Sequence, residues 1–144
     1  MTDIDYDDPI VAAQWLLEQR RRVQRYLEGQ GLANPRVSEH PDWFVAPYLA
    51  VWTVESLRAP GSVGWWAVSG DVPTDYLSGG AAPDARSAVA AFSTRWRDLA
   101  DRMLRGENHP SMKVGRPEDA RELGAFLRRR ADLLGEFAAD DGVW

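Results

Sequence analysis

Apolar residues recur every three or four positions near the start of the chain, which is the period of an amphipathic helix. The stripe consists of Val11, Trp15, Leu16, Val23 and Leu27. Asp8 and Pro9 precede it and are typical of a helix start, because a carboxylate caps free amides and proline fits the first turn. Gly29 and Gly31 are typical of a helix end. The pattern predicts a helix between these signals, with Trp15 in the core.

The period changes to two in the centre of the chain. Residues 48–55 and 63–69 are rich in the β-branched and aromatic residues that favour strands, and the residues between them are typical of a turn. The two strands are therefore expected to form an antiparallel hairpin. Pro47 has no amide donor and is expected at a strand start or a bulge. A short third strand near Tyr76 would extend the sheet.

The last third of the chain is helical again. A helix that opens at Pro83-Asp84 carries one apolar stripe, made of Val89, Phe92, Trp96, Leu99 and Met103. A second helix opens at Pro117 and ends at Asp140; its stripe is Leu123, Leu127, Leu134 and Ala138, flanked by Phe126 and Phe137. On the first of these helices, two pairs are spaced as ion pairs, Asp98 with Arg102 and Asp101 with Arg105. The fold is predicted to be α+β, with a central antiparallel β-hairpin or three-stranded sheet packed by one N-terminal and two C-terminal helices.

Composition limits the chemistry that the chain can perform. With 144 residues and 44% apolar residues, residues 1–144 are expected to form a single globular domain. There is no Cys, and His40 and His109 are the two histidines, so thiolate chemistry and His-rich metal cages are excluded. No metal and no cofactor is expected. The acidic start lacks the apolar core of a secretory signal, and the longest uncharged apolar run, 43–54, is too short to span a bilayer. A cytoplasmic protein without a membrane partner is predicted.

The charge balance favours one kind of partner over another. Asp and Glu number 22 against 17 Lys and Arg, which gives a net charge of −5. A nucleic-acid partner is disfavoured, because such binders need cations that displace phosphate counterions. Two arginine triplets, 20–22 and 128–130, lie in predicted helices and are expected to be solvated and paired with acidic side chains. An acidic surface is suited to a basic protein partner.

The central block carries a long and distinctive motif. It runs from Trp43-Phe44-Val45-Ala46-Pro47-Tyr48 through Trp52 and Gly64-Trp65-Trp66 to Ser69-Gly70-Asp71 and Pro73-Thr74-Asp75-Tyr76. With this block, the sequence resembles a family of uncharacterised bacterial proteins, the domain of unknown function 4826, over most of the chain. The resemblance implies a single-domain bacterial protein with helices before and after the motif. It implies no activity.

Two carboxylates after the second strand form a candidate site. Asp71 and Asp75, beside Thr74 and Tyr76, have the groups needed for an acid/base pair or for oxygen ligands to a cation. The same residues are equally typical of turns, where Asp and Thr side chains bind nearby amides. His40 with Asp42 has the composition of a general base and its orienting carboxylate, although a loop histidine is commonly a surface residue.

Seven tryptophans are a high number for a chain of this length. Trp15, Trp52 and Trp96 fit apolar stripes and are predicted to lie in the core. Trp65 and Trp66 are neighbours on one strand and must face opposite sides of it, so that one of them, with Trp43 and Trp144, is expected to remain partly exposed.

Such aromatic side chains beside acidic residues suggest a non-enzymatic protein–protein interaction module of immunity or regulatory type. A small enzyme or ligand-binding protein that uses Asp71, Asp75, Tyr76 and His40 is the alternative. The sequence leaves both hypotheses open.

Overall fold

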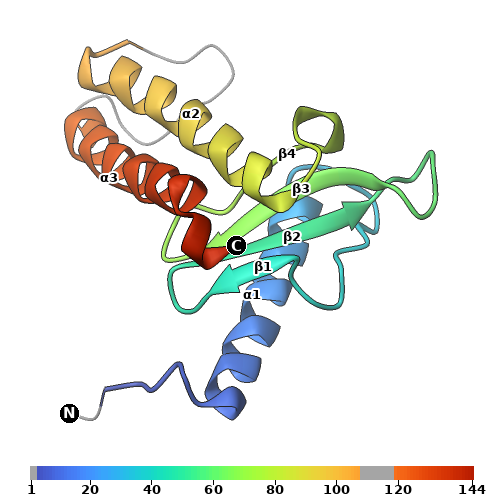
Figure 1. Cartoon of the computed structure of the whole chain (residues 1–144). Coiled ribbons are helices and arrows are strands. Elements are labelled where there is room, and N and C mark those ends of the chain that lie inside the picture. Colours follow the sequence, from blue (N-terminus) through green and yellow to red (C-terminus); the bar gives the residue numbers. More distant parts are fainter. Residues whose placement is uncertain (1–2, 108–118) are drawn as a thin grey trace. The chain divides into compact units, whose positions relative to one another are not determined.

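The structure is a computed structural model that describes residues 3–107 and 119–144. The chain forms two compact units, the sheet unit (Met1–Ala85) and the helix-pair unit (Arg86–Trp144). Figure 1 shows their elements, with the sheet and its first helix in blue and green and the two later helices in yellow and red. Helices and strands are both present, so the predicted α+β class is confirmed.

The described part of the sheet unit contains one α-helix, α1 (Pro9–Gly29), followed by four strands and a 3-10 turn, Gly79–Ala81. The strands are β1 (Trp43–Val45), β2 (Leu49–Glu55), β3 (Val63–Gly70) and β4 (Asp75–Ser78). Each strand pairs antiparallel with the next one along the chain, in the order β1-β2-β3-β4. The predicted hairpin is β2–β3, and β4 is the predicted strand at Tyr76. The expectation of at most three strands was wrong.

The additional strand is β1, whose three residues pair with the start of β2. Trp43 lies opposite Val51 and Val45 lies opposite Leu49. Three residues are too few to show an alternating pattern, and Pro47 follows closely after them. Pro47 lies in the connection between β1 and β2 and follows a cis peptide bond, so it is placed just before a strand, as predicted.

Helix α1 packs on one face of this sheet and forms the core of the unit there. The buried core consists of Trp15, Val23 and Leu27 of the helix with Val37, Ala50, Trp52, Val54 and Ala67. The predicted cap is present, because the Oδ1 atom of Asp8 accepts a hydrogen bond from the amide of Ile10 at 2.9 Å. Trp52 is fully buried, and its indole Nε1 donates to the Ser69 hydroxyl at 3.1 Å. A buried indole N–H needs such a partner.

The first arginine triplet departs from its expected role. Arg20 does not simply extend into solvent: its guanidinium donates to the carbonyl oxygens of Val37 and Ser38, each at 2.9 Å. Val37 in turn pairs with Val54 of β2. Arg20 therefore holds the segment at Val37 and Ser38 against the edge of β2. The spacing of charges in the sequence did not indicate this role.

The helix-pair unit consists of α2 (Ala85–Leu104, which begins at the last residue of the sheet unit), α3 (Ala120–Ala139) and a 3-10 turn, Asp141–Val143. All five predicted stripe residues of α2 are buried. On α3, Leu127 and Leu134 are buried as predicted, whereas Leu123 and Ala138 are partly exposed. The buried positions between the leucines are Gly124 and Ala131. A Cβ atom on Gly124 would lie 3.1 Å from the Met103 Cβ, so a small residue is needed where the helices approach. The predicted start at Pro117 lies outside the described residues.

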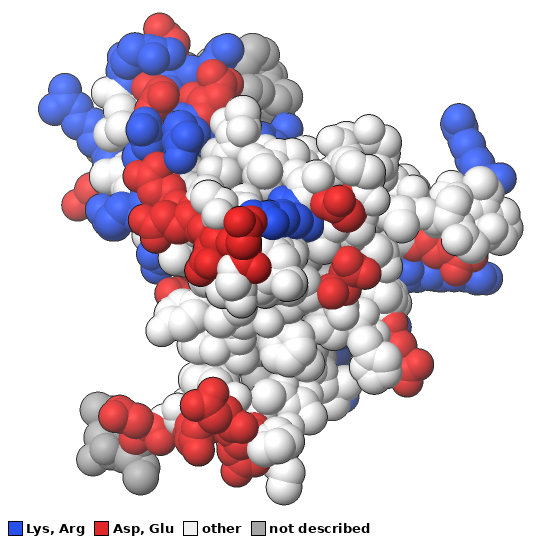
Figure 2. All heavy atoms as spheres, viewed as in Figure 1, with Lys and Arg blue, Asp and Glu red and all other residues white. Residues whose placement is uncertain are grey.

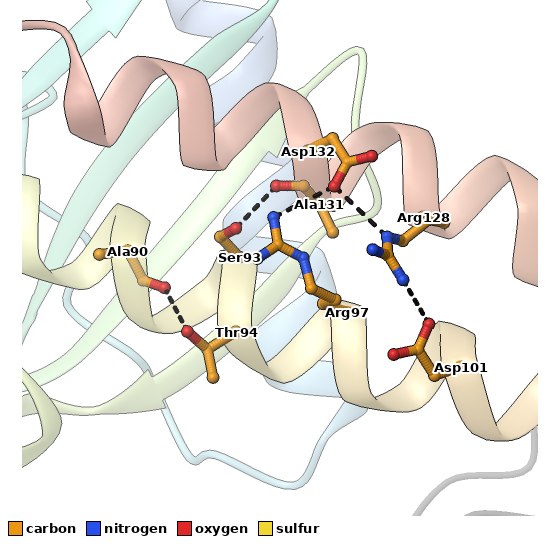
Figure 3. Close-up of polar contacts among 8 residues, drawn as sticks. All are labelled: Ala90, Ser93, Thr94, Arg97, Asp101, Arg128, Ala131 and Asp132. Atoms are coloured by element: carbon orange, nitrogen blue, oxygen red, sulfur yellow. Dashed lines mark hydrogen bonds and ion pairs between the residues drawn. The ribbon is translucent and has the colours of Figure 1, made fainter.

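Polar side chains connect the two helices of this unit (Figure 3). The Ser93 hydroxyl donates to the carbonyl oxygen of Ala131 at 2.7 Å. Asp132 accepts hydrogen bonds from Arg97 at 3.1 Å and from Arg128 at 3.4 Å, and Arg128 also binds Asp101. Arg128 is thus paired with acidic side chains, as expected for the second triplet. The predicted Asp98–Arg102 ion pair is also present, at 3.3 Å. In the second predicted pair, by contrast, Asp101 binds Arg128 and Arg105 binds Glu107.

Candidate functional site

The register of the sheet separates the residues that the sequence proposed as one site. Asp75 pairs with Val68, and Tyr76 pairs with Ala67 of the core cluster. Because neighbouring strand residues point to opposite faces, Tyr76 faces α1 and Asp75 faces away from it. Trp65 shares the α1 face with Tyr76, whereas Trp66 shares the other face with Asp75. The Asp75 and Tyr76 side chains therefore do not converge on one site.

Trp65 and Trp66 differ in burial, because neighbouring residues of β3 point to opposite faces of the sheet. Trp66 is the buried member of the pair, and its indole Nε1 donates to the carbonyl oxygen of Ala82 at 3.0 Å. Trp65 is partly exposed and packs against the α1 core. Trp43 and Trp144 are also partly exposed. The three tryptophans predicted to lie in the core, Trp15, Trp52 and Trp96, are all buried.

Asp75 is the first residue of β4 and has a local role in the backbone. Its side chain is 4% exposed, and its Oδ1 atom accepts a hydrogen bond from the Tyr76 amide at 2.8 Å. The Tyr76 ring packs edge-on against Tyr26 of α1, with ring centroids 6.0 Å apart. Both side chains are thus used within the sheet unit, Asp75 at the start of a strand and Tyr76 beside the core.

Asp71 lies at the surface, next to the connection between β1 and β2. Its backbone amide donates to the carbonyl oxygens of Tyr48 at 3.1 Å and Pro47 at 3.2 Å. The preceding residue, Gly70, has a φ of +132°, and a Cβ atom there would lie 2.4 Å from the Tyr48 oxygen. Only glycine fits this close approach. We call this close approach of Gly70 and Asp71 to Tyr48 the joint; it holds Asp71 beside Tyr48.

Two exposed aromatic side chains lie at this edge of the sheet, Phe44 in β1 and Tyr48 in the connection that follows it. We define the aromatic rim as Phe44 and Tyr48 with the exposed Asp42 and Asp71. Trp43, the neighbour of Phe44 in β1, is partly exposed and points to the opposite face of the sheet. Phe44 is 41% exposed and Tyr48 is 48% exposed. The Phe44 ring lies 6.5 Å from the Trp15 ring, which supports it from the core side. Sequence reasoning missed Phe44 and Tyr48 as surface residues, because their exposure follows from the position of β1 at the edge.

The remaining candidate residues lie elsewhere. His40 is exposed in the loop before β1, and His109 lies outside the described residues. Within residues 3–107 and 119–144, no group of three or more His, Asp or Glu side chains is arranged to hold a metal ion. A depression of about 370 Å³ in the sheet unit is lined by residues of 36–39, 53–55 and 61–63, which include none of the predicted site residues.

Comparison with known proteins decides the family. The model of the DUF4826 family, a domain of unknown function, matches residues 10–144. The chain belongs to the DUF4826 family. No curated protein and no solved structure matches it.

This match to DUF4826 confirms the family resemblance that the central motif indicated. The match includes β1 and the whole aromatic rim. The DUF4826 description assigns no activity, so the chemistry of the chain must be argued from its own side chains. Among the described parts of the chain, no helix is both long enough and apolar enough to cross a membrane.

Proposed function

We propose that this protein is a cytoplasmic, non-enzymatic binding module of immunity or regulatory type, which binds a basic protein through the aromatic rim. The observation that carries the proposal is the exposure of Phe44 and Tyr48 beside Asp71. Aromatic side chains with an apolar body at the surface are the usual anchors of protein interfaces. A well-packed anchor of this kind typically contributes about 2 kcal/mol or more to binding.

The net charge of the sheet unit supports a basic partner. The sheet unit has 6 arginines against 12 acidic residues, a net charge of −6. The segment 37–57, which contains β1 and β2, has three acidic residues and no Lys or Arg. Complementary charge speeds association and disfavours acidic competitors. A partner with Lys or Arg around an apolar contact therefore fits the rim.

The alternative is a small enzyme or ligand-binding protein that uses Asp71, Asp75, Tyr76 and His40. Such a site requires these side chains to converge on a reacting atom. Asp75 and Tyr76 extend from opposite faces of β4, and Asp75 is engaged with a backbone amide. The geometry supports the interaction module better.

Capture of partners from the native host tests the proposal. The bait is the whole chain, compared with Phe44→Ala and Tyr48→Ala and with a matched control, Leu57→Ala. Leu57 is 60% exposed but lies between β2 and β3, outside the rim. We expect a basic protein that is captured by the wild type and by Leu57→Ala, lost with either rim variant and released by salt. Identical capture by all four baits would contradict the proposal.

A further inference from the structure

Helix α1 has an apolar surface on the side that does not face the sheet. Residues 9–17 contain no charged side chain. Ile10 is 70% exposed and Leu17 is 51% exposed, whereas Trp15 is buried against the core. Ile10 and Leu17 are seven residues apart and therefore lie on the same side of the helix. In Figure 1 the first turns of α1 extend past the sheet. Apolar side chains in this arrangement are typical of a helix that has a partner.

The two ends of this surface carry opposite charges. Before the helix, Asp3, Asp5, Asp7 and Asp8 are all exposed. Acidic side chains are visible at the bottom of Figure 2, where Figure 1 places the N-terminal segment. Arg21 follows Leu17 by one helical turn and is exposed on the same side. We define the outer α1 face as Ile10, Ala13, Gln14, Leu17 and Arg21.

The outer α1 face is complementary to itself. Its midpoint lies between Ala13 and Gln14, with Ile10 and Leu17 at equal distances on either side. In an antiparallel pair of helices centred there, Ile10 of one copy meets Leu17 of the other. Arg21 lies about 11 Å from the midpoint along the helix, at a rise of about 1.5 Å per residue. It therefore reaches just past Pro9, the first residue of the other helix, where the acidic segment of that copy lies.

We propose that the protein pairs with a second copy of itself through the outer α1 faces, antiparallel and about a two-fold axis. A two-fold interface uses the same patch on both copies, so each Arg21–aspartate contact occurs twice. Parallel pairing would place the two acidic segments together. A foreign cationic helix would be attracted to the aspartates and repelled by Arg21 at the other end. A second copy provides an arginine for the acidic end and aspartates for Arg21. The aromatic rim is not part of this pairing.

Sedimentation equilibrium of the whole chain measures the pairing directly. We expect the wild type to dimerise reversibly with rising concentration. Leu17→Asp should raise the dissociation constant of the dimer at least tenfold, because it places a charge against Ile10 of the other copy at both ends of the apolar contact. The matched control, Leu57→Asp, makes the same change at an exposed leucine outside the face and should leave the dimer unchanged. A wild type that stays monomeric would overturn the proposal and leave the outer α1 face to a partner of another sequence.

A charge exchange tests the antiparallel arrangement. Arg21→Glu alone, and Asp5→Lys with Asp7→Lys in a second variant, each place like charges at both contacts and should weaken the homodimer. Mixed in equal amounts, the two variants restore opposite charges at both contacts, so they should form a heterodimer of near wild-type affinity. Circular dichroism checks that each variant is folded. Failure of the folded variants to pair on mixing would overturn the antiparallel arrangement.

Discussion

The two units of the chain use their polar and apolar side chains differently. In the helix-pair unit, 11 cationic and 10 acidic residues nearly balance, and Arg97 of α2 and Arg128 of α3 both donate hydrogen bonds to Asp132. In the sheet unit, acidic residues outnumber cationic ones two to one. Most of the large apolar side chains that are exposed in the described chain also belong to the sheet unit; those residues are Ile4, Ile10, Leu17, Phe44, Tyr48, Leu57 and Val63.

The difference indicates which unit offers a binding surface. Charges that are paired within the helix pair are already partly neutralised and contribute little to attracting a partner. An excess of one charge beside exposed aromatic rings attracts partners of the opposite charge and provides apolar anchors. The proposed interaction surface therefore lies on the sheet unit.

The largest effect is expected from the buried stripe of the helix-pair unit. Phe92→Ala removes a fully buried ring and should lower the free energy of unfolding by about 3–5 kcal/mol, the range for large-to-small changes in cores. Leu57→Ala, at a position that is 60% exposed between β2 and β3, is the control and should have little effect. Urea denaturation gives both values. Equal midpoints would mean that the stripe of α2 is not a core.

In the sheet unit, a large effect is expected at the joint beside the rim. Gly70→Ala combines a strained backbone with a Cβ atom 2.4 Å from the Tyr48 oxygen, and it should cost about 3 kcal/mol. Gly61 also has a positive φ, but the space around it is open, so Gly61→Ala should cost about 1 kcal/mol. Thermal denaturation compares the two variants. If Gly61→Ala were the more damaging, the joint would not depend on the close approach of Gly70.

A smaller effect is expected from the buried hydrogen bond of Trp52. Ser69→Ala leaves the indole N–H without its acceptor in the core of the sheet unit, and it should cost about 1–3 kcal/mol. In the double variant Ser69→Ala with Trp52→Phe, no donor is left unsatisfied. A double-mutant cycle by chemical denaturation should therefore show coupling between the two positions. Strict additivity would mean that the bond contributes nothing to stability.

The smallest effect is expected at the polar bridge between the helices. Asp132 is half exposed, so Asp132→Asn should cost about 0.5 kcal/mol or less, even though two arginines contact its side chain. The loss of unfolding free energy should become still smaller with added salt, which urea denaturation at several salt concentrations can measure. A cost that is large and independent of salt would show that the bridge, rather than the apolar stripe, holds the pair together.

Helices were predictable from the sequence because each signal is local. The stripe of α2 and the cap at Asp8 depend on residues within a few turns of one another, and both were confirmed. The buried face of α3 was only partly predicted. Gly124 is buried because a neighbouring helix approaches it closely, and no property of the residue itself indicates that approach.

The candidate surface was harder to predict, because exposure at a sheet edge depends on pairing between distant segments. The split between Trp65 and Trp66 follows from strand parity, but which of them is buried depends on which face α1 covers. Phe44 and Tyr48 are aromatic residues of the kind that commonly lie in a core. Their exposure follows from the short β1 strand and from the joint at Gly70, neither of which has a pattern in the sequence.

The affinity of a captured basic partner for single variants of both units tests the central claim most directly. Isothermal titration would compare Tyr48→Ala of the aromatic rim with Leu104→Ala, at an exposed apolar position of the helix-pair unit. We expect a loss of roughly thirtyfold for Tyr48→Ala, which corresponds to about 2 kcal/mol, and no change for Leu104→Ala. Unchanged affinity for Tyr48→Ala together with a loss of affinity for Leu104→Ala would place the binding surface on the helix-pair unit. That result would contradict the claim that the sheet unit binds the partner.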